Sequence, residues 1–196
     1  TKNTGSNILE TLTINSNSAA NTISDIQTTS AGTTGLNIGG SQDLTIATVL
    51  DNEIITINTA SATGNMTYGF GTGAVSVTGG AGVDTVTANS GVNTISLAGG
   101  NDLINFSGTH LTSDDTVNGG AGTDIISYSS DETIALADFT NVSGFEALTS
   151  ANSVNIAGNL GALAATAGIK TVTFNDDGDG DNLVIDAEFN NTLMVN

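Results

Sequence analysis

Glycine-rich segments that end in aspartate recur at a fixed spacing in the middle of the chain, where their carboxylates could bind a metal ion. Residues 79–87 read GGAGVDTVT and residues 119–127 read GGAGTDIIS, and both match the nine-residue pattern G-G-x-G-x-D-x-U-x, in which U is a large apolar residue. Two weaker copies, ANSGVNTIS at 88–96 and LAGGNDLIN at 97–105, keep the same register between them. With a four-residue insertion around 107–110, the sixth positions of the series are Asp84, Asn93, Asp102, Asp115 and Asp124.

The oxygen atoms of these turns match the preferences of Ca²⁺, which takes roughly six to eight oxygen ligands from carboxylates and carbonyls. Two turns that are 18 residues apart would lie above one another and could enclose an ion. This spacing pairs Asp84 with Asp102 and, if the insertion is looped out, Asp102 with Asp124. The predicted carbonyl ligands are Gly80, Gly82, Gly100, Gly120 and Gly122. The alternative interpretation is that these aspartates are solvated in ordinary glycine-rich turns.

Asn93 and Asp115 belong to the opposite edge of the same stack, because one repeat makes half a coil. Both are candidate metal ligands. Asn93 brings no charge, so the site on this edge is expected to be weaker or empty.

A second acidic cluster lies near the C-terminus, in the segment NDDGDGDN. Asp177, Asp179 and Asp181 have the alternating spacing of a calcium-binding loop, and Glu188 is at the twelfth position counted from Asp177. The sixth position holds Asn182 where an EF-hand needs glycine, and no flanking helices are predicted. The pattern therefore allows a calcium site of another kind, with a solvated acidic turn as the alternative.

A nine-residue repeat of this composition predicts an all-β fold, a parallel β-solenoid or β-roll with calcium-binding turns. Six residues form a glycine-rich turn and three form a short strand, and two repeats complete one coil. The apolar eighth positions point inward between two stacked sheets. They are occupied by Val86, Ile95 and Ile104.

Outside the repeats the sequence still indicates strands, because apolar and polar residues alternate between clusters of Gly, Asn and Ser. The predicted strands are Ile8–Asn15, Leu44–Val49, Ile54–Asn58, Val75–Thr78 and Val172–Phe174. One short helix is predicted over 159–168, with Asn159 as its cap and Gly168 as its stop. We expect solenoid coils over 1–78, the calcium-binding block over 79–127 and a β-rich continuation over 128–196, in one continuous domain.

The charge of the chain limits the kinds of partner that it can bind. The 196 residues include 20 Asp and Glu against 2 Lys and Arg, for a net charge of −18. Nucleic acid and anionic membrane surfaces are therefore unfavourable partners, whereas cations are favourable ones. Because 38% of the residues are hydrophobic, the chain can form a core once its carboxylates are neutralised. It has no cysteine, so bound metal is the remaining candidate for cross-linking the fold.

Catalysis is not expected. The single histidine, His110, lies in the insertion, where no nucleophile turn is recognisable. Zinc is unfavourable without cysteine and with one histidine. Adjacent carboxylates such as Asp131 and Glu132 are expected by chance in so acidic a chain.

The two full nonapeptides resemble those of RTX (repeats-in-toxin) proteins. Val142–Thr149 reads VSGFEALT and Ile8–Ile14 reads ILETLTI, and these segments are similar to elements of bacterial surface-layer proteins exported by type I secretion. The resemblance implies a secreted, cell-surface protein that assembles with copies of itself into a two-dimensional lattice when calcium binds. It also implies attachment to lipopolysaccharide through a region outside this sequence.

The hypothesis is therefore a structural scaffold in which calcium switches on folding outside the cell. One alternative is a stalk segment of an adhesin or biofilm-matrix protein, which would form isolated rods. Another is an accessory calcium-binding module of a secreted polysaccharide-modifying enzyme, which would bind glycans.

Overall fold

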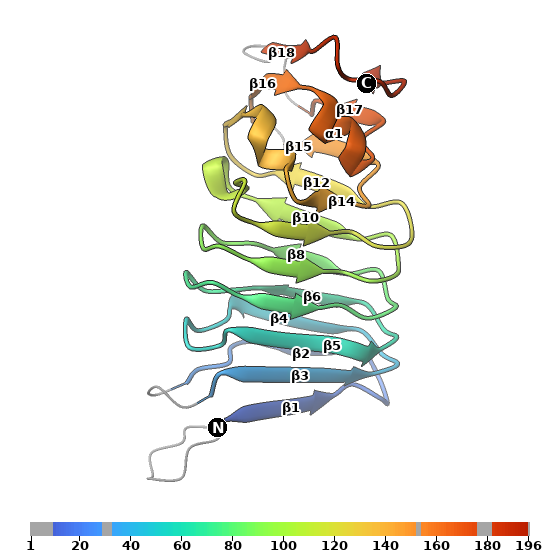
Figure 1. The fold of residues 1–196 in the computed structure, drawn as a ribbon. Helices are drawn as coiled ribbons and strands as arrows, with labels where there is room; N and C mark the ends of the chain where they lie inside the picture. Colours follow the sequence, from blue (N-terminus) through green and yellow to red (C-terminus); the bar gives the residue numbers. More distant parts are fainter. Residues whose placement is uncertain (1–9, 29–32, 152–153, 176–181, 196) are drawn as a thin grey trace.

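The computed structural model describes residues 10–28, 33–151, 154–175 and 182–195, and these form one stack of coils (Figure 1). The predicted ligands Asp177, Asp179 and Asp181 lie outside the described residues. The helices within the described ranges are all too short to span a lipid bilayer.

The coils place successive strands alternately in two sheets whose strands pair in parallel. The seven-stranded sheet has the order β1-β3-β5-β7-β9-β11-β14, and the nine-stranded sheet has the order β19-β17-β15-β12-β10-β8-β6-β4-β2. Strands of the first sheet are β1 (Thr11–Asn15), β3 (Gly35–Gly40), β5 (Thr56–Ala62), β7 (Ser76–Thr78), β9 (Thr94–Ser96), β11 (Thr116–Asn118) and β14 (Val142–Ser143). Strands of the second are β2 (Asn21–Ile23), β4 (Leu44–Val49), β6 (Met66–Gly69), β8 (Thr85–Thr87), β10 (Leu103–Phe106), β12 (Ile125–Tyr128), β15 (Ala147–Ser150), β17 (Thr171–Thr173) and β19 (Met194–Val195). The predicted β-solenoid is confirmed.

The length of a coil follows the repeat. In the nonapeptide block, Thr67 pairs with Thr85 and Thr85 pairs with Leu103, so one coil takes 18 residues. The next coil takes 22, because Leu103 pairs with Ile125. The four extra residues lie in a segment that contains the 3₁₀ helix η1 (Gly108–His110), outside the strands, so the sheets keep their register.

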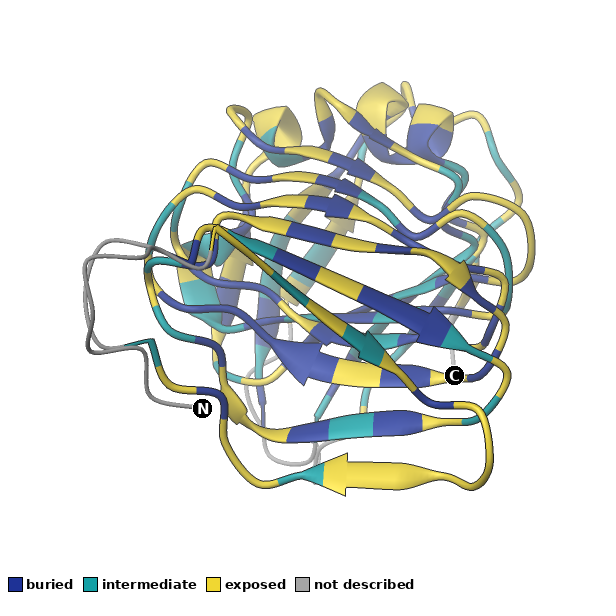
Figure 2. Cartoon of the chain, turned by 90° about the horizontal axis from the view of Figure 1, so that it is seen from below, coloured by how far each residue is buried: buried dark blue, intermediate teal, exposed yellow. Residues whose placement is uncertain are grey.

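The core lies between the two sheets and follows the apolar eighth positions of the repeats. Val86, Ile104 and Ile126 are fully buried and stack directly on one another in the nine-stranded sheet. Ile95 and Val117 stack in the same way on the facing sheet. Seen along the stack, buried and exposed residues alternate along the strands (Figure 2). The alternation follows from the period of two in a β-strand, which turns every second side chain inward.

The last coils add a third sheet and a short helix. β13 (Glu132–Ile134), β16 (Ile156–Leu160) and β18 (Asn182–Ile185) form the three-stranded sheet, and η2 (Leu136–Phe139) follows β13. Helix α1 (Ala162–Ala167) packs against β14, the last strand of the seven-stranded sheet, and against η2. The predicted stop at Gly168 is confirmed, with φ at +111°. The predicted cap was wrong: Gly161 is the N-cap, because Asn159 lies inside β16 and pairs with Val184.

We predict that the core column is the main source of stability in the repeat block. Ile104→Ala should lower the free energy of unfolding by about 2 to 5 kcal/mol, because the side chain is fully buried and its removal leaves a cavity. Ile185→Ala, at a side chain that is 44% exposed, should change it by less than about 0.5 kcal/mol. Denaturant unfolding of both variants under the same ionic conditions measures the difference, and equal losses would contradict the assignment of the core.

Candidate cation site

Three of the predicted aspartates stack on one edge of the solenoid. The turns on this edge lead from the seven-stranded sheet to the nine-stranded sheet and comprise residues 79–84, 97–102, 119–124 and 144–146. We call this the aspartate edge, which is the right-hand edge of the stack in Figure 1. Asp84, Asp102 and Asp124 precede strands β8, β10 and β12, whose first residues are in register, so the three carboxylates form a row along the stack.

Each carboxylate of the row uses one oxygen to connect two coils. Oδ1 of Asp84 accepts the backbone N–H of Met66 at 2.8 Å. Oδ1 of Asp102 accepts that of Asp84 at 2.8 Å, and Oδ1 of Asp124 accepts that of Asp102 at 2.7 Å. These hydrogen bonds hold the three side chains in one orientation.

The second oxygen of each carboxylate has no protein partner. Asp84, Asp102 and Asp124 are 1%, 1% and 0% exposed, and the Oδ2 atom of each is buried without a hydrogen bond. A buried polar atom without a partner costs roughly 1 to 3 kcal/mol, and more if it is charged. Each of the three atoms therefore needs either a proton or a ligand that the chain itself does not supply.

The pKa values reflect the same lack of partners. Burial raises the pKa of Asp84 to about 6, although the Met66 N–H bonded to Oδ1 and the nearby Gly80 N–H oppose the rise. Burial also raises the pKa of Asp102 to about 6, and the charges of Asp84 and Asp124 add to the effect. The pKa of Asp124 is raised by burial and by the charge of Glu146. Without a counter-charge, the ionised row is unfavourable.

Backbone carbonyls crowd the same edge, since glycine lets consecutive turns touch. A Cβ on Gly100 (φ +135°) would overlap the carbonyl oxygen of Gly82, and a Cβ on Gly122 would overlap that of Gly100. A Cβ on Gly120 (φ +104°) would likewise overlap the carbonyl oxygen of Ala98. The Gly80 carbonyl accepts the Gly99 N–H at 3.1 Å. The predicted glycines thus lie on the same edge as the three aspartates.

The opposite edge is closed by side-chain amides. We call it the asparagine edge; its turns comprise residues 70–75, 88–93 and 107–115. The Nδ2 group of Asn89 donates to the carbonyls of Gly71 and Gly73, the latter at 2.7 Å. Nδ2 of Asn93 donates to the Gly91 carbonyl at 2.6 Å. On this edge an amide group thus binds the turn carbonyls.

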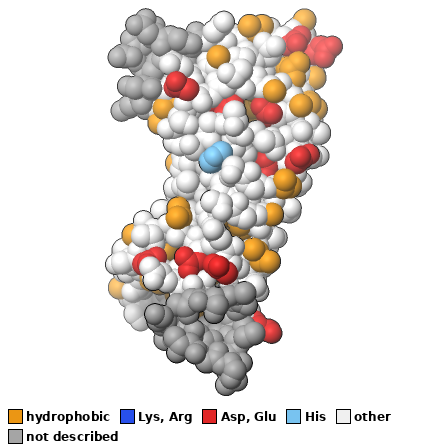
Figure 3. Space-filling model, turned by 90° about the vertical axis from the view of Figure 1, so that its left-hand side faces the viewer, with side chains coloured by type: hydrophobic (Ala, Val, Ile, Leu, Met, Phe, Trp, Pro, Cys, Tyr) orange, Lys and Arg blue, Asp and Glu red, His pale blue; other side chains and the backbone are white. Residues whose placement is uncertain are grey.

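Asp115 is also hydrogen-bonded through both oxygens. Its Oδ1 accepts the Asn93 N–H at 2.7 Å, and its Oδ2 accepts the N–H and the hydroxyl of Thr112 at 2.9 and 3.0 Å. The structure brings Asn93 and Asp115 together, away from the aspartate edge, but their role as cation ligands stays a prediction. Figure 3 shows the face that carries the single histidine, where acidic and hydrophobic side chains are scattered over the surface.

Glu146 belongs to the row, although the repeat pattern did not reveal it. Its Oε2 accepts the Asp124 N–H at 2.9 Å, which is the contact that each aspartate makes with the coil before it. The turn 144–146 has three residues in place of six, and the longer side chain of glutamate spans the difference. The sequence feature that could have revealed Glu146 is its spacing, because Glu146 follows Asp124 by 22 residues, as Asp124 follows Asp102.

The row is bounded at both ends by other residue types. Leu44 and Met66, both buried, occupy the corresponding positions in the preceding coils. Lys170 occupies the position after Glu146, where its backbone N–H donates to the Glu146 carbonyl at 2.9 Å. Lys170 is the only basic residue in the part of the chain that the structure describes, and it lies beyond Glu146, so no described basic side chain lies within the row.

The ligand chemistry of this edge is that of oxygen alone. Among the described residues, no group of three or more His, Asp or Glu side chains is placed to share one metal ion. An ion at the row would therefore need backbone carbonyls together with one or two carboxylates, a mixture that suits Ca²⁺.

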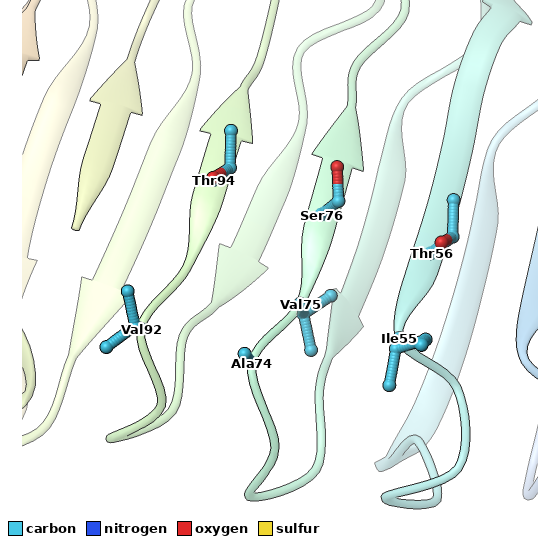
Figure 4. Close-up of a pocket in the computed structure, with 7 residues that line it drawn as sticks. All are labelled: Ile55, Thr56, Ala74, Val75, Ser76, Val92 and Thr94. Carbon is cyan, nitrogen blue, oxygen red and sulfur yellow. The ribbon is translucent and has the colours of Figure 1, made fainter. Parts of the chain in front are cut away.

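A shallow depression of about 290 Å³ lies at the start of β5, β7 and β9, near the asparagine edge (Figure 4). It is lined by Ile55, Thr56, Ala74, Val75, Ser76, Val92 and Thr94. Its polar side chains are the hydroxyls of Thr56, Ser76 and Thr94, and no acidic, basic or imidazole side chain lines it.

One buried carboxylate lies outside the row, at the first strand of the third sheet. Glu132 is 5% exposed, and its Oε2 is buried without a hydrogen bond. Burial raises its pKa from the ordinary 4.5 to about 7, and the charge of Asp138 adds to the rise. Burial and these two carboxylates also raise the pKa of Tyr128.

The comparisons with known proteins found no family model, no curated protein and no solved structure that matches this chain.

We predict that glycine is required where the turns touch. Gly100→Ala should unfold the repeat block at lower temperature, because the added Cβ would overlap the Gly82 carbonyl and φ is +135°. Gly99→Ala is the matched control, since the nearest atom to its Cβ, the Ala121 carbonyl oxygen, lies 3.9 Å away. Thermal unfolding should show a loss of several degrees for the first variant and about 1 °C or less for the second; similar values would contradict close stacking.

Glu132 should make stability depend on pH. The folded chain keeps this proton up to about pH 7, whereas the unfolded chain loses it near 4.5, so stability falls as pH rises through that window. Glu132→Gln should reduce the fall in melting temperature between pH 5 and pH 8. Glu188→Gln, which removes a carboxylate from an exposed side chain, is the control. The assignment is wrong if both variants behave alike.

Proposed function

We propose that this chain is a structural, calcium-dependent cell-surface scaffold. The observation that carries the proposal is the row of three buried aspartates, each with one hydrogen-bonded oxygen and one free oxygen. An enzyme site would need converging groups with distinct acid and base roles. This row instead repeats the same group once per coil, as a structural element does.

Calcium is the ion that the edge suits best. Its ligands are oxygen atoms from carboxylates and carbonyls at about 2.3 to 2.6 Å, with flexible geometry. The aspartate edge supplies free carboxylate oxygens beside glycine turns whose carbonyls touch the next coil. Magnesium demands a stricter octahedral arrangement and keeps most of its waters, so it suits a dry, stacked edge less well.

Calcium binding would be coupled to folding. The chain carries a net charge of −18, and folding buries three carboxylates in one row. Where calcium is scarce, the repulsion among them opposes closure of the coils, which would keep the chain open for export. Outside the cell, where calcium is abundant, the free energy of binding becomes free energy of folding.

The scaffold role rests on the resemblance of the nonapeptides to those of secreted surface-layer proteins and on the shape of the molecule. A stack of coils presents long flat sheets and two end strands to copies of itself. Electron microscopy after calcium addition tests this part: extended sheets support the scaffold, whereas isolated rods would favour a stalk.

Asp102→Asn tests the cation site. The amide oxygen can still accept the Asp84 N–H, and the Nδ2 group can donate to turn carbonyls as Asn93 does on the other edge. In chelator the variant should be more stable than the natural chain. When free calcium is about 100 times the dissociation constant of a site, binding at that site should raise the melting temperature of the natural chain by roughly 5 to 10 °C. The same calcium concentration should raise the melting temperature of the variant by less.

Asp43→Asn is the control, because Asp43 is exposed and lies before the row begins. It should respond to calcium as the natural chain does in the same melting experiment. A natural chain that melts at one temperature in calcium and in chelator would overturn the proposed function.

A further inference from the structure

The far end of the row, between Asp124 and Glu146, has the components of a cation site that the repeat pattern does not contain. Asp124 is fully buried, and its Oδ2 has no hydrogen-bond partner. Its Oδ1 is held by the Asp102 N–H at 2.7 Å, so the side chain cannot turn to satisfy both oxygens within its own coil. The free oxygen is therefore available to the next coil.

The next coil brings two oxygen-bearing groups to the same place. The Gly144 carbonyl oxygen and Asp124 Oδ2 both lie within 2.9 Å of the position that a Cβ on Gly119 would take. The two oxygens are therefore at most about 5 Å apart, a separation that one ion with ligand distances of about 2.6 Å can bridge. A side chain at 119 would overlap both groups, so glycine is required at this position.

Glu146 supplies the second carboxylate. One of its oxygens accepts the Asp124 N–H at 2.9 Å, which leaves the other for a ligand. The Gly120 carbonyl and Asn118 Oδ1 each lie 3.2 Å from the position that a Cβ on Gly144 would take, which adds oxygen atoms around the short turn. Beyond this point the row ends at Lys170, whose positive charge would disfavour a further cation.

We infer that Asp124 and Glu146 form a terminal calcium site. In this site Glu146, on a three-residue turn, is the carboxylate ligand that an aspartate on a six-residue turn provides elsewhere in the row. This inference rests on the proposed function. It places the last ion outside the nonapeptide block and connects the repeats to the C-terminal coils.

Glu146→Gln tests the site, because glutamine can still accept the Asp124 N–H but loses the charge. Native mass spectrometry in calcium should show one ion fewer per chain than in the natural protein. Glu53→Gln is the control, since Glu53 lies before the row and bonds Thr28, and it should bind as many ions as the natural chain. An unchanged count in Glu146→Gln would overturn the terminal site. A natural chain that binds no calcium at all would overturn the proposed function.

Carboxyl footprinting of the natural chain gives a second test that needs no variant to fold. With carbodiimide and an amine, Glu146 should label several-fold less in calcium than in chelator, whereas Glu53 should change little. Equal labelling of Glu146 in both conditions would contradict the site.

Discussion

The stacking of the repeat block depends on a carboxylate that serves two coils at once. On the aspartate edge, each aspartate of the row accepts a backbone N–H from the coil before it and keeps its other oxygen buried and unpaired. The glycine turns make this arrangement possible, because they bring consecutive backbones into contact and leave no room for side chains. Stable closure of this edge therefore requires either a proton or a cation at every step of the row.

Much of this arrangement could be predicted from the sequence. The nine-residue period gave the length of a strand, the inward direction of Val86 and Ile104, and the 18-residue coil. It also placed Asp84 above Asp102, because identical turns at a constant spacing must coincide in a parallel stack. The insertion near His110 did not disturb this prediction, since it lies outside the strands.

Other features depend on contacts that a repeat pattern does not encode. Glu146 joins the row through a shorter turn and a longer side chain, so both its residue type and its local spacing differ from the pattern. Asn93 and Asp115 each accept a backbone N–H from the preceding coil, and their remaining hydrogen bonds come from their own turns, where Thr112 supplies two of them. Asn159 looked like a helix cap but was taken into β16 by pairing with Val184, because pairing with a neighbouring strand outweighed its local preference.

The apolar side chains of Leu44 and Met66 divide the solenoid into two parts. They fill, with apolar atoms, the place that carboxylates take in the following coils. Closure there relies on the exclusion of water from hydrocarbon, which chelators and moderate ionic strength hardly alter. One uninterrupted solenoid thus joins a segment whose edge is closed by hydrocarbon to a segment whose edge is lined by buried, titratable carboxylates, and the border between them is a single step from Met66 to Asp84.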